Sequence, residues 1–161
     1  NADLTKYSMQ FNSKRIMEVS NLMDSTNPDL SKFFQRGGKL VILEHLADYA
    51  QSPYAGMQYF AAMQEKMGQS TTQKFARLFV TPGVDHVGAG APANVDMLPV
   101  LVNWVEKGKS PDSLEVVEQE VKAPFPVKRA LPLCQWPMWP KYKVGNGNVA
   151  SSFECVSSGL F

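Results

Sequence analysis

Two side chains suited to acid–base chemistry, Asp48 and His86, each follow an apolar run of the chain. Asp48 ends the segment LVILEHLAD at residues 40–48, and His86 ends ARLFVTPGVDH at residues 76–86. A histidine can act as general base while an aspartate beside it holds the imidazole in one tautomer and stabilises its charged form. The pair is therefore two thirds of a possible serine–histidine–aspartate triad.

A serine nucleophile for this triad is missing from the sequence. Where the triad occurs in the chain order serine, aspartate, histidine, the serine sits in a Gly-x-Ser-x-Gly turn after an earlier strand. None of the serines here has glycine on both sides at that spacing, and none follows a strand that precedes Asp48. We therefore expect the nucleophile to lie outside this chain.

Both residues also have plainer interpretations. His86 lies in the glycine-rich stretch PGVDHVGAGAP and could be a polar loop residue, and Asp48 could lead the helix that follows it. A metal site could be assembled from His45, Asp48, Asp85 and His86, but their spacing fits no zinc pattern. A cysteine nucleophile served by His86 is weaker, because Cys134 has no helix start or cationic neighbour to favour its thiolate.

The elements that must position these residues alternate between strand and helix. Apolar runs predict buried strands at 39–45 and 74–82, and helical spacing predicts helices at 53–68 and 94–107, with the polar linker QSTTQ before the second strand. A charged stretch at 115–122 predicts an edge strand. This alternation is typical of an α/β sheet, whose sites form at the carboxyl ends of parallel strands. We expect two parallel strands with flanking helices.

The chain divides into two parts in this interpretation. Residues 1–122 form the α/β portion, and residues 123–161 form an extended tail, rich in proline and poor in regular structure. The tail holds both cysteines, Cys134 and Cys155, without a nearby histidine that would complete a zinc site. A disulfide is favoured over free thiols, and it would indicate an oxidising compartment.

Composition excludes some classes of partner. The 161 residues are 44% hydrophobic and 19% charged, with a formal net charge of +1, which argues against a nucleic acid or an acidic membrane as the main partner. No apolar run approaches the roughly 20 residues needed to cross a bilayer. Because residue 1 is Asn, we expect a processed or truncated amino terminus. Two parallel strands leave a sheet edge uncovered, so we also expect a tightly held partner.

Four blocks of the sequence, in this order, resemble the carboxyl-terminal part of the tannase and feruloyl esterase family of α/β-hydrolases, which includes mono-hydroxyethyl terephthalate hydrolase. The blocks are NPDLSKFFQRGGKLVILEHLAD (27–48), TPGVDHVGAGAP (81–92), LVNWVEKGKSPDSL (101–114) and a terminal block from RALPLCQWP to FEC (129–155). The similarity thus covers residues 27–155, and the order and spacing of the blocks make it more specific than any single motif.

The resemblance implies the carboxyl-terminal part of a secreted or periplasmic esterase that cleaves carboxylic esters of phenolic or other aromatic acids. It implies Asp48 as triad acid, His86 as general base, and a disulfide between Cys134 and Cys155. The family's serine, its oxyanion donors and its substrate-covering lid, which often carries a structural calcium, would all lie upstream. The expected partner is therefore a serine-bearing segment or chain of the same enzyme.

The sequence departs from the family's pattern close to the histidine. Val87 stands where the family commonly has a cysteine that is tethered beside the serine, Asp85 replaces a small residue, and Glu44-His45 replaces His-Gly. A charged Asp85 is expected to stabilise the imidazolium form of His86. These departures leave open an alternative, a non-catalytic binding or structural module derived from the same fold.

Overall fold

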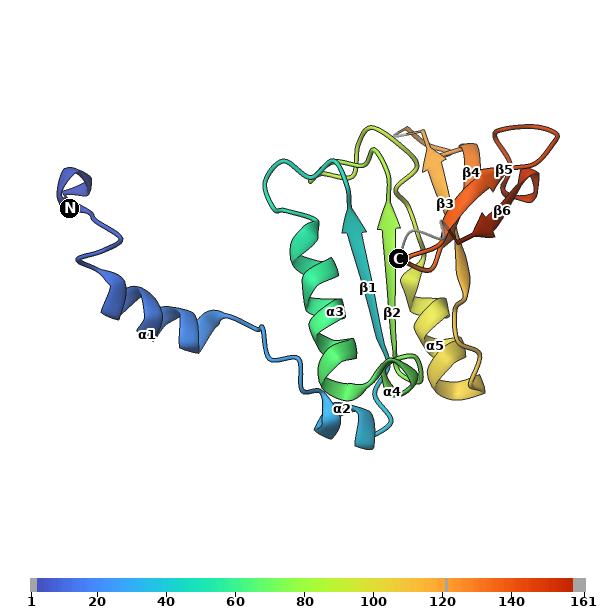
Figure 1. Cartoon of the computed structure of the whole chain (residues 1–161). Coiled ribbons are helices and arrows are strands. Elements are labelled where there is room, and N and C mark those ends of the chain that lie inside the picture. Colours follow the sequence, from blue (N-terminus) through green and yellow to red (C-terminus); the bar gives the residue numbers. More distant parts are fainter. Residues whose placement is uncertain (1–2, 121, 158–161) are drawn as a thin grey trace.

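Two layers of secondary structure cover a short parallel sheet in the computed structural model, which describes residues 3–120 and 122–157 (Figure 1). The helical elements are η1 (Leu4–Lys6), α1 (Ser13–Met23), α2 (Ser31–Gln35), α3 (Tyr54–Met67), α4 (Gln69–Thr72), α5 (Met97–Lys107) and η2 (Ala150–Ser152). The strands are β1 (Leu40–His45), β2 (Ala76–Thr81), β3 (Ser113–Gln119), β4 (Val127–Cys134), β5 (Trp139–Tyr142) and β6 (Phe153–Val156).

The two predicted strands of the sheet are confirmed, and they pair in parallel. The register runs from Leu40 opposite Ala76 to His45 opposite Thr81. Because side chains alternate across a strand, each strand supplies one row to each face of the sheet. The carboxyl ends of β1 and β2 consequently lie side by side, with their following loops at the same edge (Figure 1).

One face of this sheet packs against α3 and α2. Phe60 and Met63 of α3 are buried together with Phe75 and Leu78. The ring of Phe34, in α2, lies 5.3 Å from that of Phe75, centroid to centroid. The helix predicted at 53–68 thus exists at Tyr54–Met67 and ends at Gly68, as expected.

The opposite face packs against the antiparallel pair β3–β4. Phe79 of β2 forms a second buried cluster with Val116 of β3 and Leu133 of β4. Nearby, Trp104 of α5 is buried, and its ring centroid lies 4.9 Å from the Arg77 guanidinium carbon. With both faces covered, five of the six β2 residues are buried, and only Val80 is partly exposed.

The polar linker QSTTQ differs from the prediction, whereas the expected edge strand is present with shifted bounds. Residues 69–72 form the short helix α4, because the Thr72 amide donates to the Gly68 carbonyl at 3.0 Å and closes a helical turn. The strand predicted at 115–122 starts two residues earlier and ends at Gln119, and Val121 lies outside the described residues. It pairs with β4, so it has a neighbour on one side.

The proline-rich tail holds more regular structure than its composition predicts. β4 pairs with β3, and β5 pairs with β6, both antiparallel. Pro132 and Pro140 lie inside strands, opposite Glu115 and Cys155, and such positions are tolerated at sheet edges, where a missing N–H costs little. The division of the chain into two parts at residue 122 stays a prediction. The β3–β4 pair joins residues from both sides of that boundary.

The predicted disulfide is present in the tail. Cys134, at the end of β4, is bonded to Cys155 of β6, with 5.6 Å between their Cα atoms. It therefore ties the β5–β6 hairpin to the β3–β4 pair, whose β4 strand is buried against the sheet at Leu133.

The amino-terminal residues extend away from this body. Helix α1, which carries the apolar residues Ile16, Val19, Leu22 and Met23, has no buried residue and projects outward (Figure 1). Leu22 is 84% exposed, which leaves its apolar face uncovered. Within the described residues, no helix has the length and apolar character to span a bilayer.

Reducing the disulfide is expected to destabilise the protein. Opening a loop that spans 21 positions restores chain entropy to the unfolded state, which corresponds to about 3 kcal/mol. We expect dithiothreitol to lower the free energy of unfolding, measured in denaturant, by this order. The double variant Cys134→Ala/Cys155→Ala is the control and should not respond to the reductant. An equal response of both proteins would contradict the prediction.

Candidate active site

Backbone pairing between β1 and β2 continues beyond the ends of the strands. The Leu46 amide donates to the Thr81 carbonyl at 3.0 Å, and the Ala47 amide donates to the Val84 carbonyl at 3.0 Å. These bonds join the aspartate loop (residues 46–53) to the histidine loop (residues 82–93). Asp48 and His86 are thereby brought together, although 38 residues separate them.

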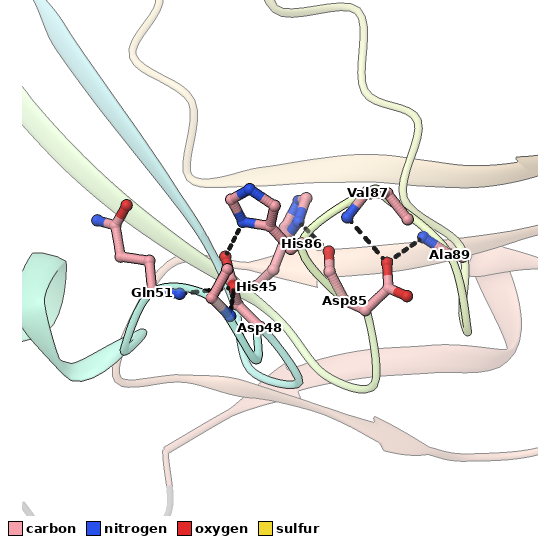
Figure 2. Close-up of polar contacts among 8 residues, drawn as sticks. His45, Asp48, Gln51, Asp85, His86, Val87 and Ala89 are labelled. Atoms are coloured by element: carbon pink, nitrogen blue, oxygen red, sulfur yellow. Dashed lines mark hydrogen bonds and ion pairs between the residues drawn. The ribbon is translucent and has the colours of Figure 1, made fainter. Parts of the chain in front are cut away.

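The two carboxylate oxygens of Asp48 have different partners. Oδ1 accepts hydrogen bonds from the amides of Ala50 at 2.8 Å and Gln51 at 2.9 Å. Oδ2 lies 3.0 Å from Nδ1 of His86. The side chain is 16% exposed. The turn that follows the strand therefore fixes the carboxylate and aims its second oxygen at the imidazole (Figure 2).

His86 is held at one ring nitrogen and is accessible at the other end of the ring. When the carboxylate of Asp48 is ionised it accepts only, so Nδ1 is the nitrogen that carries a proton in this contact. Nε2 is then the basic nitrogen of the neutral ring. Half of the side chain is exposed, and the ring centroid of Tyr49 lies 6.2 Å from that of the imidazole. The arrangement can accept a proton from a group placed next to Nε2.

Glycines allow the histidine loop to fold back on itself. Gly83, Gly88 and Gly90 all have positive φ, at 72°, 82° and 98°. At Gly90 a Cβ atom would lie 2.5 Å from the Gly83 carbonyl oxygen, so a side chain does not fit there. Val84, between the first glycine and His86, is fully buried and anchors the loop in the core.

The carboxylate of Asp85 is hydrogen-bonded within the histidine loop. Its Oδ1 accepts hydrogen bonds from the amides of Val87 at 3.0 Å and Ala89 at 2.8 Å. The carboxylate thus turns toward the backbone of its own loop, while the imidazole of His86 turns toward Asp48 (Figure 2). Stabilisation of the imidazolium form of His86 by the charge of Asp85 stays a prediction.

The loop amides and the imidazole hold the pKa of Asp48 low. Its pKa falls from the ordinary 3.8 to about 2, first because the Gln51 amide donates to the carboxylate and then because of the His86 side chain. Asp48 is therefore the ionised partner of His86 across the neutral and mildly acidic range. A fixed negative charge at Nδ1 suits a histidine that must carry a positive charge for part of a reaction cycle.

The alternative sites considered from the sequence find no support in the geometry. Among residues 3–120 and 122–157, no three His, Cys, Asp or Glu side chains are grouped so that they could hold a metal ion. Cys134 is in a disulfide, which removes it as a thiolate nucleophile.

Sequence reasoning missed the parts of the site that are made by the backbone. The amides of Ala50 and Gln51 and the buried anchor Val84 carry no chemical signal of their own. The sequence marks His45 as a possible metal ligand and as a departure from the family's pattern, and neither predicts that its Nδ1 lies 3.0 Å from the Asp85 carbonyl oxygen. The available signal was the tendency of Asp to accept hydrogen bonds from amides two or three residues ahead in a turn.

The contribution of Asp48 to stability is expected to vanish in acid. Because its pKa is lower in the folded state, ionised Asp48 stabilises the fold above about pH 4, and this contribution is lost as the pH falls toward about 2. We expect the advantage of the wild type over Asp48→Asn, in free energy of unfolding by denaturant, to shrink across that interval. A difference that stays constant there would rule out a lowered pKa.

A side chain at Gly90 is expected to disturb the histidine loop more than one at Gly88. Alanine is strained at both positions by the positive φ, at a cost of about 1–2 kcal/mol. Only at Gly90 does the added Cβ also meet backbone, whereas at Gly88 the nearest atom is 4.0 Å away. Gly90→Ala should therefore lower the free energy of unfolding further than the control Gly88→Ala. Equal losses would contradict this account of the loop.

Comparison with known proteins gives the site its context. The chain is 36% identical over 159 residues to a probable feruloyl esterase of Arthroderma benhamiae, with 96% of this chain and 29% of the relative covered. It is 33% identical over 135 residues to mono(2-hydroxyethyl) terephthalate hydrolase of Piscinibacter sakaiensis, with 83% of this chain and 22% of the relative covered. The chain thus spans less than a third of the length of these relatives.

The fold agrees with the sequence comparison. The structure of feruloyl esterase B from Aspergillus oryzae matches with a TM-score of 0.82 at 23% identity, over 97% of this chain and 34% of that one. The α/β-hydrolase-like fold predicted from the sequence is thereby confirmed as a partial one. The family described as tannase and feruloyl esterase matches residues 1–156. This chain belongs to the tannase and feruloyl esterase family.

Proposed function

We propose that this chain supplies the acid and the base of a serine carboxylic ester hydrolase, with Asp48 orienting His86 and His86 acting as general base. The observation that carries the proposal is the 3.0 Å contact between Asp48 Oδ2 and His86 Nδ1, made by a carboxylate whose other oxygen is fixed by two amides. The amides of Ala50 and Gln51 hold one oxygen of Asp48 so that the other faces the imidazole, as the acid of a triad requires.

The proposed ester hydrolysis uses Nε2, the ring nitrogen of His86 that is not bonded to Asp48. Nε2 of His86 accepts the proton of a serine hydroxyl as the serine attacks the ester carbonyl, and then gives that proton to the leaving alcohol. A water molecule repeats the sequence on the acyl-enzyme and releases the acid. Ionised Asp48 stabilises the imidazolium at each proton transfer, in keeping with its low pKa.

The serine is expected on a segment outside this sequence. The matched part is 29% of one relative and 22% of another, so a serine elbow, oxyanion donors and a lid have room in the remainder of such a protein. Within the described residues, β1 pairs with β2 alone, and all six β1 side chains are only partly buried. A further part of the sheet adding to β1 would cover this edge.

Esters of phenolic or other aromatic acids are the proposed substrates, since a probable feruloyl esterase and a terephthalate ester hydrolase are among the relatives. A structural calcium, as the family resemblance implies, would lie in the lid and therefore outside this chain. The disulfide supports a secreted or periplasmic location.

Loss of the base should abolish turnover. In the full-length protein that contains this chain, we expect His86→Ala to lower kcat for methyl ferulate on the order of 10⁴-fold, with Asp48→Asn close behind. Asp29→Asn is the matched control, because Asp29 also accepts hydrogen bonds in a loop, from Ser31, and should leave kcat unchanged. This chain alone should show no turnover. Undiminished hydrolysis by His86→Ala would favour a non-catalytic module.

A further inference from the structure

Asp85 is the centre of the hydrogen bonds that close the histidine loop. Its amide donates to the Ala89 carbonyl at 2.9 Å, and its carbonyl accepts from the Gly88 amide at 3.1 Å. Its Oδ1 accepts from the amides of Val87 and Ala89. The amide, the carbonyl and one carboxylate oxygen of the residue directly before His86 are therefore all hydrogen-bonded within the loop.

His45 joins this loop to the end of β1. Its Nδ1 lies 3.0 Å from the Asp85 carbonyl oxygen in a partly buried position. A carbonyl can only accept, so Nδ1 of His45 donates. Figure 2 shows the His45 ring directed at this carbonyl, with the ring of His86 beside it directed at Asp48.

The acceptor of this bond belongs to the peptide group that precedes His86. Because a peptide group is planar, fixing the Asp85 carbonyl also fixes the direction in which the chain enters the His86 Cα atom. Asp48, in turn, donates its amide to the His45 carbonyl at 3.2 Å. His45, Asp85, His86 and Asp48 thus form a closed ring of contacts, in which both ends of the Asp48–His86 pair are tied to one residue.

We propose that His45 and Asp85 are positioning residues that fix the orientation of the His86 imidazole; this inference rests on the proposed role of His86 as general base. Two other links, Leu46 to Thr81 and Ala47 to Val84, are backbone bonds that do not involve the His45 side chain, and Val84 is fully buried. Removing the His45 bond therefore leaves the carbonyl before His86 bonded only within its own loop, to the Gly88 amide, while the two strands stay paired. A small displacement of a reacting group lowers rate without unfolding the protein.

Three substitutions at His45 in the full-length protein separate the hydrogen bond from simple packing. Asparagine places an N–H where Nδ1 of histidine lies, whereas glutamine places one where Nε2 lies. We expect His45→Ala to lower kcat for methyl ferulate by about 10- to 100-fold with KM nearly unchanged. His45→Asn should restore most of kcat, and His45→Gln should stay close to the alanine variant. Equal kcat for the asparagine and glutamine variants would overturn the proposal.

Amide hydrogen exchange tests the same idea without turnover. Exchange at Val87, Gly88 and Ala89 should be faster in His45→Ala than in the wild type and return toward the wild-type rate in His45→Asn. Unchanged exchange and unchanged kcat in His45→Ala would sink the inference while leaving the role of His86 intact. Conversely, if His86→Ala retains full kcat, the proposed function fails, and the exchange rates still decide whether His45 orders the loop.

Variants of Asp85 provide a second route if His45→Ala does not fold. Asp85→Ala removes both side-chain bonds to the loop amides, whereas Asp85→Asn retains an oxygen acceptor at Oδ1. We expect the alanine variant to lower kcat by about tenfold or more and to speed exchange at Val87 and Ala89, with the asparagine variant near the wild type. A wild-type kcat in Asp85→Ala would contradict the positioning role.

Discussion

The parallel pairing of β1 with β2 is the constraint on which the candidate site depends. The ladder does not stop at His45 and Thr81, because the amides of Leu46 and Ala47 continue it into the histidine loop. Ordering two loops against each other costs conformational entropy for every residue involved. Here the strands already hold the loops side by side, so the Asp48–His86 contact has only the last few residues to order.

The strand that leads to His86 is more deeply buried than the strand that leads to Asp48. β2 lies between α3 on one face and β3–β4 on the other, and burial continues past the strand, since Val84 is fully buried in the loop. β1 is only partly covered along its length. His86 therefore follows the more deeply buried strand, β2. Asp48 follows β1, whose outer edge is where we propose that the rest of the sheet pairs. This asymmetry is consistent with a site that is completed by another segment.

How far the sequence predicts this arrangement depends on the type of signal. Two apolar runs and their following loops predict both strands, their parallel pairing and the meeting of Asp48 with His86, because parallel strands share one edge for their carboxyl ends. The direction of the Asp85 carboxylate was not predictable, since it depends on amides that are aligned only after the loop has closed. Strands β4 to β6 were missed because proline content masks strands that lie at sheet edges.

Two departures from the family's usual pattern, His45 and Asp85, contact each other in the structure. In the sequence, His45 and Asp85 stand 40 residues apart and read as two separate changes, each of which weakens the expectation of catalysis. In the fold they are bonded to each other, and the shared carbonyl adjoins His86. The hydrogen bond between His45 and the Asp85 carbonyl holds the peptide that precedes the proposed base. The contact therefore argues for a histidine whose orientation still matters, and it weighs against the interpretation of the fold as an inactive remnant.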